Sequence, residues 1–196
     1  MDFDEQLLTQ NHPAKLFARI YLWQKPGITQ AFNKNFPKDL LSLDHQHRCT
    51  GGGLVFHSPK DVLLTLITPL QTTGQKIKPI LTELQSYIHK SIKDLKTINH
   101  KSTSNVFSNI NSCQHYHSPF ELFYQNTKCV AIAARKFSNK LILQCIIHNG
   151  DTLYFKNKIP TKYMSYLANP LKVCPNKLQE NLIQNLYKNT FFTHSL

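Results

Sequence analysis

The chain is short of acidic residues and has no long apolar run. Among its 196 residues, 11 are aspartate or glutamate and 23 are lysine or arginine, which gives a formal net charge of +12 at pH 7. No uninterrupted apolar stretch approaches the ~18 residues that a membrane-spanning helix needs. The composition therefore predicts no membrane span, and a charge balance this basic predicts an anionic partner.

The cysteines are scattered and unpaired in sequence. The five cysteines are an odd number, and none of them forms a Cys-x-x-Cys pair. This pattern argues against a disulfide framework and against a cysteine-rich zinc site. The first residues are acidic and no apolar stretch follows them, unlike a signal peptide. We therefore expect a cytoplasmic protein without a metal centre.

Signatures of nucleic-acid recognition are also missing, although nucleic acid is the partner that a basic chain suggests first. The lysines are scattered along the chain, which has no helix-turn-helix, zinc-finger or RNA-recognition signature. Charge alone predicts weak, non-specific attraction to nucleic acid and no specific binding.

Glycine is rare, but three of the six glycines stand side by side at residues 51–53. Arg48 precedes this run, and β-prone residues and His57 follow it. Because glycine has no Cβ, the backbone here can approach another group closely, and its successive amides can hold a carbonyl or phosphate oxygen. A plain turn needs neither the arginine nor the histidine, so the run predicts a binding loop that leads into a strand.

The remaining pattern predicts strands in the middle of the chain and helices around them. Strands are expected at 19–23, 28–29, 54–56, 62–68, 120–124, 129–134 and 141–147, and a turn with a further strand is expected at 151–155. Helices are expected at 4–8, 38–43, 77–95, 161–167 and 176–188. Two of these strands, 62–68 and 141–147, are apolar on both faces and are therefore expected to be central. The sequence predicts a single α+β domain over residues 1–196, with a mixed or antiparallel sheet and packed helices.

A polar segment at 97–119 is long enough to favour a functional role over simple connection. It contains Cys113 close to His115 and His117. A thiol beside imidazoles can become a thiolate nucleophile, although it can equally be an incidental cysteine. Three closely spaced residues in a loop seldom supply a full tetrahedral set, so no metal is expected there.

The glycine run is part of a longer pattern that resembles a known signature. Arg48-x-Thr50-Gly51-Gly52-Gly53-x-Val55-x-His57 is similar to the motif of lipoate–protein ligases and octanoyltransferases, in the biotin/lipoate protein ligase superfamily. Further similar stretches follow the family's order and spacing from residue 4 to about 155: Asp4-Glu5-x-Leu7-Leu8, Arg19-x-Tyr21-x-Trp23-x-x-Pro26 and Lys128-Cys129-Val130-Ala131.

The resemblance implies the catalytic-domain fold of that superfamily, here without a C-terminal accessory domain. It also implies an apolar tunnel for an acyl chain along the glycine run, and a catalytic lysine, Lys128, that points at the acyl carbonyl. The substrate-binding residues that it implies are Arg48, Thr50, Gly51, Gly52, Gly53, Val55, His57 and Ala131. The local pattern places Lys128 in a turn at 125–128.

The leading hypothesis is a lipoate–protein ligase. Such an enzyme uses ATP and Mg²⁺ to convert lipoate or octanoate to acyl-AMP. It then transfers the acyl group to a lysine of an acidic lipoyl domain, in a 2-oxoacid dehydrogenase complex or the glycine-cleavage H protein. The basic surface suits both ATP and an acidic protein partner.

Two alternatives stay open. Cysteine-dependent octanoyltransferases of the family, which need no ATP, carry Cys-Phe-x-x-Pro-x-x-Tyr-Glu just before the lysine. Cys113, Phe120 and Glu121 stand in that register, with Gln114 where the phenylalanine is expected and His117 where the proline is expected. The other alternative is a degenerate, non-catalytic acyl-binding relative. It is suggested by three residues that replace family glycines, namely Ala31, Ala131 and Cys145.

Overall fold

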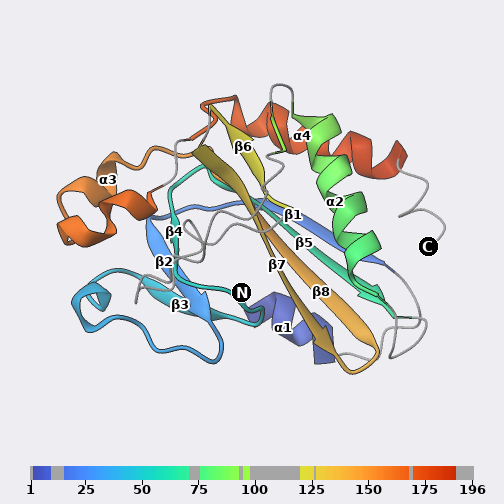
Figure 1. Ribbon diagram of the computed structural model, residues 1–196, viewed down its shortest axis with the longest axis horizontal. Helices are drawn as coiled ribbons and strands as arrows, with labels where there is room; N and C mark the ends of the chain where they lie inside the picture. Colours follow the sequence, from blue (N-terminus) through green and yellow to red (C-terminus); the bar gives the residue numbers. More distant parts are fainter. Residues whose placement is uncertain are drawn as a thin grey trace.

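Two β-sheets form the frame of the molecule, a computed structural model that describes residues 2–9, 16–70, 76–92, 95–97, 120–125, 127–167 and 170–188 (Figure 1). The larger sheet has five strands in the order β1-β5-β8-β7-β6, and the smaller sheet has three in the order β3-β2-β4. The larger sheet consists of β1 (Phe17–Leu22), β5 (Val62–Pro69), β6 (Leu122–Tyr124), β7 (Thr127–Phe137) and β8 (Lys140–Ile147). The smaller sheet consists of β2 (Gly27–Ala31), β3 (His45–Arg48) and β4 (Val55–His57).

The larger sheet is antiparallel throughout, and one of its faces carries the main core. Side chains alternate along a strand, so Leu64 of β5 and Leu143 of β8 point to the same face. Two helices, α2 (Lys78–Ser91) and α4 (Pro175–Lys188), pack against that face (Figure 1). As predicted, β5 and β8 are central strands.

The opposite face of the larger sheet is covered at one end by α1 (Asp2–Thr9). Leu7 and Leu8 of this helix pack against Ile67 and Ile142. The amino-terminal helix therefore lies on the same side of the sheet as the glycine run, and this position matters for the site.

The smaller sheet has a core of its own. Three short helices pack on it: η1 (Lys38–Leu40), α3 (Leu153–Lys156) and η2 (Thr161–Tyr166). The fully buried Phe155 meets Phe56 of β4 with ring centroids 5.3 Å apart. The two sheets thus keep separate cores and meet along β4.

Residues 151–155 were predicted to be a turn followed by a strand, and the strand is wrong. The carboxylate of Asp151 accepts a hydrogen bond from the Leu153 N–H at 2.8 Å, and this side-chain bond starts a helical turn instead of a strand. The expected helix at 77–95 ends at Ser91, and the expected helix at 161–167 is a 3-10 helix.

A second sheet and the polar strand β3 were not foreseen. The segment at 97–119, with Cys113, His115 and His117, lies outside the described residues except for residue 97 at its start. No helix within the described residues is long and apolar enough to cross a membrane.

Candidate functional site

Arg48, at the end of β3, forms hydrogen bonds to the glycine loop (residues 49–54). Its Nη2 donates to the carbonyl oxygens of Gly51 at 2.8 Å and Gly53 at 2.6 Å, and its Nη1 donates to Thr29 Oγ1 at 3.2 Å. The side chain is buried. Arg48, expected to bind substrate, therefore shapes the loop by turning two of its carbonyls inward.

The packing of the protein does not require glycine at every position of the loop. Gly52 has φ of 100°, a conformation that favours glycine over any other residue. A Cβ added to Gly51 would approach nothing closer than the carbonyl oxygen of Ala134, at 4.0 Å, which is an ordinary contact. Glycine at position 51 therefore leaves the backbone open to an outside group.

Thr50 connects the loop to α1 through a chain of side chains. Its hydroxyl donates to Gln144 Oε1 at 2.7 Å, and Gln144 Nε2 donates to Asp4 Oδ2 at 2.9 Å. Asp4 is fully buried and also accepts from Thr65 at 2.8 Å and from Arg19 at 3.0 Å. The loop, the sheet and the amino-terminal helix are thus tied together by one satisfied polar network.

His57 is a buried, neutral imidazole at the end of β4. Its ring stacks on Trp23 with centroids 4.1 Å apart, and its Nε2 lies 2.8 Å from Thr29 Oγ1. Its Nδ1 is buried and has no hydrogen-bond partner among the described residues. Burial lowers the pKa of His57 from 6.5 to about 3. An unsatisfied buried nitrogen of this kind is open to a hydrogen bond from water or a ligand.

Lys128 is not in a turn, as its sequence neighbourhood suggested, but is the second residue of β7. Its side chain is buried and forms an ion pair with Glu121, which is also buried. A buried pair of this kind adds little to stability, because desolvation offsets the attraction between the charges. Its presence therefore favours a functional role.

A β-bulge changes the direction of the side chains at the start of β7. Leu122 of β6 stands opposite Val130, but its neighbour Phe123 stands opposite Lys128, so Cys129 is an extra residue in the ladder. A bulge bends the strand and changes the direction of nearby side chains. The direction of Lys128 is therefore set by this irregularity and does not follow from simple alternation along β7.

An apolar contact joins the two sheets beside the glycine loop. Val55 of β4 packs against Ala131 and Ile146, which face each other on β7 and β8. Cys145, which the resemblance places where the ligase family has a glycine, belongs to the main core on the other face of the sheet. Its added bulk therefore lies away from the loop.

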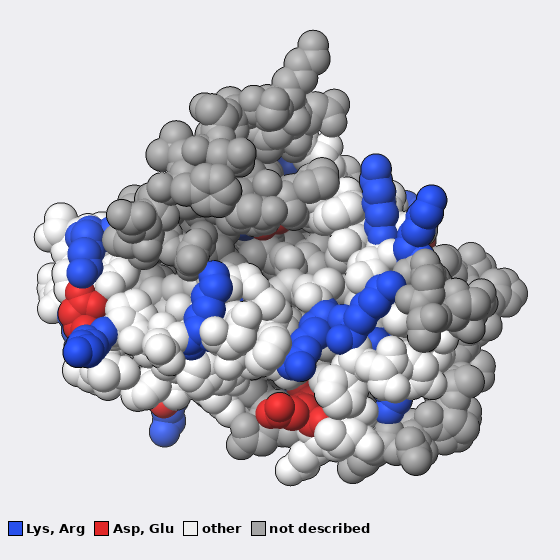
Figure 2. Space-filling model, turned by 60° about the horizontal axis from the view of Figure 1, so that its bottom comes forward, with Lys and Arg blue, Asp and Glu red and all other residues white. Residues whose placement is uncertain are grey.

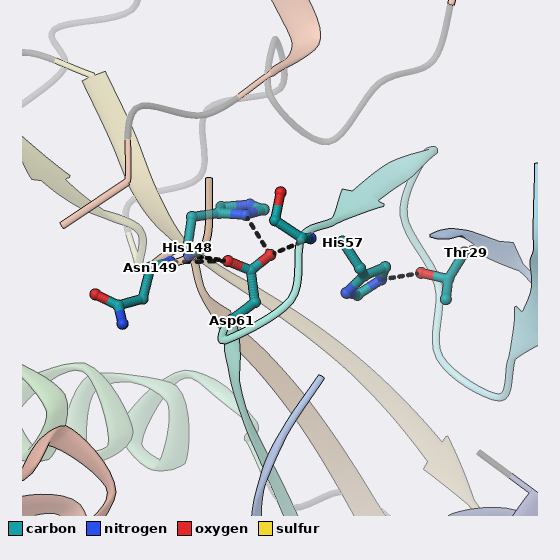
Figure 3. A network of polar contacts seen from close by, with 7 residues as sticks. Thr29, His57, Asp61, His148 and Asn149 are labelled. Carbon is teal, nitrogen blue, oxygen red and sulfur yellow. Dashed lines mark hydrogen bonds and ion pairs between the residues drawn. The ribbon is translucent and has the colours of Figure 1, made fainter. Parts of the chain in front are cut away.

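A buried carboxylate fixes the turn that follows β4. Asp61 Oδ1 accepts from the amides of Asn149 and Gly150, and Oδ2 accepts from the amide of Ser58, each at 2.8 Å (Figure 3). His148 Nδ1 lies 3.4 Å from Oδ2. Burial alone would raise the pKa of Asp61, but the imidazole and the amides lower it below the ordinary value. Figure 3 also shows His57 beside this cluster.

The structure brings most of the predicted site together where the sheets meet. The glycine loop, Val55, His57 and Ala131 lie there, and Lys128 is on the same strand as Ala131. Cys113 lies outside the described residues. Four polar residues hold the site. The motifs included Asp4 and Glu121 without assigning them this role, and sequence reasoning missed Thr29 and Gln144. A polar residue within an apolar strand, as Gln144 is, was the available signal.

The sequence matches no family model, and no curated protein matches it. Solved structures do match. An ATP-bound lipoate-protein ligase A aligns with a TM-score of 0.69 at 13% identity, over 95% of this chain and 77% of that one. The T. acidophilum protein Ta0514 with bound lipoic acid aligns with a TM-score of 0.72 at 13% identity, over 95% and 77%.

A third structure, from Thermoplasma acidophilum, contains a bipartite lipoate protein ligase and its E2 lipoyl domain. It aligns with a TM-score of 0.69 at 11% identity, over 95% of this chain and 76% of that one. The molecule therefore has the α+β catalytic-domain fold of lipoate–protein ligases, the fold that the motifs predicted. At such low identity the likeness concerns the fold alone.

Proposed function

We propose that this protein is a lipoate–protein ligase that attaches a lipoyl or octanoyl group to a lysine of a lipoyl domain. The observation that carries the proposal is the position of Lys128. This buried, paired lysine is the second residue of the strand whose Ala131 packs beside the glycine loop, in a fold shared with ATP-bound and lipoate-bound structures.

The acyl chain would lie along the junction of the sheets. Val55, Ala131 and Ile146 offer an apolar surface there, and Gly51 leaves the loop backbone open beside it. Each of the three apolar residues keeps 6–8% of its surface exposed, so the cluster is not sealed on all sides. Contact with an acyl chain would remove this remaining apolar surface from water.

The reaction has two steps. The carboxylate of the acid attacks the α-phosphorus of ATP and pyrophosphate leaves, giving acyl-AMP. The amino group of the target lysine then attacks the acyl carbon, AMP leaves, an amide forms and the amine loses its proton. Charge develops on oxygen in both steps, and a fixed ammonium such as that of Lys128 would stabilise it.

ATP and Mg²⁺ would enter together. Within the described residues no cluster of three or more His, Cys, Asp or Glu could hold a metal ion. Mg²⁺ in nucleotide sites is held largely by phosphates and water, with one or two carboxylates at most, so the residues present are compatible with it. Glu121, beside Lys128, is a carboxylate close to the expected reaction centre.

The protein partner would be an acidic lipoyl domain, of a 2-oxoacid dehydrogenase complex or of the glycine-cleavage H protein. The net charge of +12 supports such a partner, and Figure 2 shows Lys and Arg side chains spread over one face, with acidic side chains only in small groups. One structural neighbour is a ligase described with its E2 lipoyl domain.

The test is intact-mass analysis of a purified lipoyl domain after incubation with this protein. We expect a mass gain with lipoate or octanoate that requires ATP. A gain only from an octanoyl-carrier protein, lost in Cys113→Ser, would instead indicate the cysteine-dependent transferase. No gain from either donor would indicate a non-catalytic relative.

A further inference from the structure

Two histidines share one face of β3, away from the glycine loop. His45 and His47 stand two residues apart on this edge strand of the smaller sheet, and both are exposed. Because side chains alternate along a strand, both imidazoles lie on the face opposite to Arg48. Since Arg48 holds the glycine loop, the histidine pair is separate from the site described above.

The backbone selects the same tautomer in both rings. His45 Nδ1 lies 2.8 Å from the Leu43 carbonyl oxygen, and His47 Nδ1 lies 3.1 Å from the Ala31 carbonyl oxygen. A carbonyl can only accept, so Nδ1 must carry the proton in each ring. In the neutral imidazole the lone pair is then on Nε2. Histidines that bind metals are commonly held like this, with the other ring nitrogen donating to a carbonyl or carboxylate.

The phenyl ring of Phe36 contacts both imidazoles. The Phe36 ring lies 4.9 Å from the His45 ring and 4.7 Å from the His47 ring, measured between centroids. Within the described part of the chain, neither Nε2 makes a hydrogen bond. Both Nε2 atoms are thus available on one supported surface.

We propose that His45 and His47 bind a divalent transition-metal ion, such as Zn²⁺, Ni²⁺ or Cu²⁺, through their Nε2 atoms. Imidazole is a preferred ligand of these ions. No third His, Cys, Asp or Glu among the described residues completes a cluster with them. Water would fill the remaining positions, so the ion is exchangeable, unlike the closed four-ligand sites of structural zinc.

The test is a calorimetric titration of the full chain with Zn²⁺. His45→Gln and His47→Gln should each weaken binding by at least about tenfold, the lower end of the cost of losing even a supporting partner of a metal ligand. The matched control is His89→Gln, which changes an exposed histidine on α2 and should bind as the original chain does. Glutamine is polar and fits an exposed strand position, and circular dichroism verifies folding.

Nitrogen-15 spectra of the histidine side chains provide a second readout. We expect the His45 and His47 rings in the Nδ1-protonated form. Their signals should shift when Zn²⁺ is added, and each signal should be missing from the corresponding glutamine variant. Zn²⁺ binding that is unchanged in both variants, or a shift confined to other rings, would overturn the proposal. Neither measurement depends on acyl transfer.

Discussion

The charged side chains of the candidate site are buried with partners. Lys128 and Glu121 form one pair, and Asp4 is held by Arg19 together with two neutral donors. Removing one member of a buried pair leaves an uncompensated charge and costs about 3–5 kcal/mol, whereas replacing both by apolar residues is often neutral. Selection for stability alone would not require the Lys128–Glu121 pair, which is consistent with a catalytic use.

His57 makes stability depend on pH. Its pKa is about 3 in the folded protein and about 6.5 when unfolded. Between these two pH values, His57 is protonated in the unfolded chain and neutral in the folded chain. The stabilisation is complete above pH 6.5 and is lost as the pH falls toward 3, at about 1.4 kcal/mol per pH unit.

Urea unfolding at a series of pH values measures this effect. His57→Gln should be less stable near neutral pH, because it loses the stacking on Trp23, but its stability should decline less steeply toward acid. Equal slopes in the variant and the original chain would show that His57 is not the group responsible.

At the scale of elements, the conformation of the glycine loop depends on hydrogen bonds from Arg48. A lysine at this position cannot donate in fixed directions to the Gly51 and Gly53 carbonyls at once. We expect Arg48→Lys to lower kcat/KM for acyl transfer about 100-fold, as small misplacements of binding groups do. Folding is checked by circular dichroism, and a variant with unchanged kcat/KM would refute this role for the arginine.

Two glycine substitutions distinguish a glycine that the fold requires from a glycine that ligand binding requires. A Cβ on Gly150 would lie 2.0 Å from the Pro59 carbonyl oxygen, inside the turn that Asp61 fixes, so Gly150→Ala should cost about 3 kcal/mol or more. Gly51→Ala meets no such contact and should leave the free energy of unfolding almost unchanged.

If the acyl chain lies on the loop, Gly51→Ala should nevertheless raise KM for lipoate. Thermal unfolding and steady-state kinetics on both variants test the pair. A strongly destabilised Gly51→Ala, or one with normal kinetics, would contradict this view of the loop.

Several elements could be predicted because their patterns are local. The two-sided apolar runs of β5 and β8 and the helical spacing of α2 identify these elements without tertiary information. The glycine loop was likewise visible as an unusual run. β3 could not be found, because an exposed edge strand has no apolar alternation, and its polar sequence is typical of a loop.

The polar side chains that position the site could not be predicted from the sequence for a different reason. Asp4 and Gln144 are 140 residues apart, and nothing in the sequence indicates that their side chains meet beneath Thr50. The direction of Lys128 depends on a bulge at Cys129, which is set by pairing with β6 rather than by local preference.

At the scale of the whole molecule, the net charge of +12 should speed encounter with an acidic lipoyl domain. Salt screens such attraction. We therefore expect KM for the lipoyl domain to rise about tenfold between low and high ionic strength, with little change in kcat. Steady-state mass assays over a salt series measure this, with KM for lipoate as the internal control. An equal rise in both constants would point to a general effect of salt.

The central claim is that this fold activates an acyl acid beside Lys128. The most direct measurement is lipoate-dependent exchange of labelled pyrophosphate into ATP, which needs no protein substrate. The key variant is the double change Lys128→Met with Glu121→Gln, which leaves no lone buried charge. Lys25→Met, at an exposed lysine, is the control. We predict exchange by the original chain and the control, and a loss of about 100-fold or more in the double variant. No exchange by the original chain, or full exchange by the double variant, would contradict the claim.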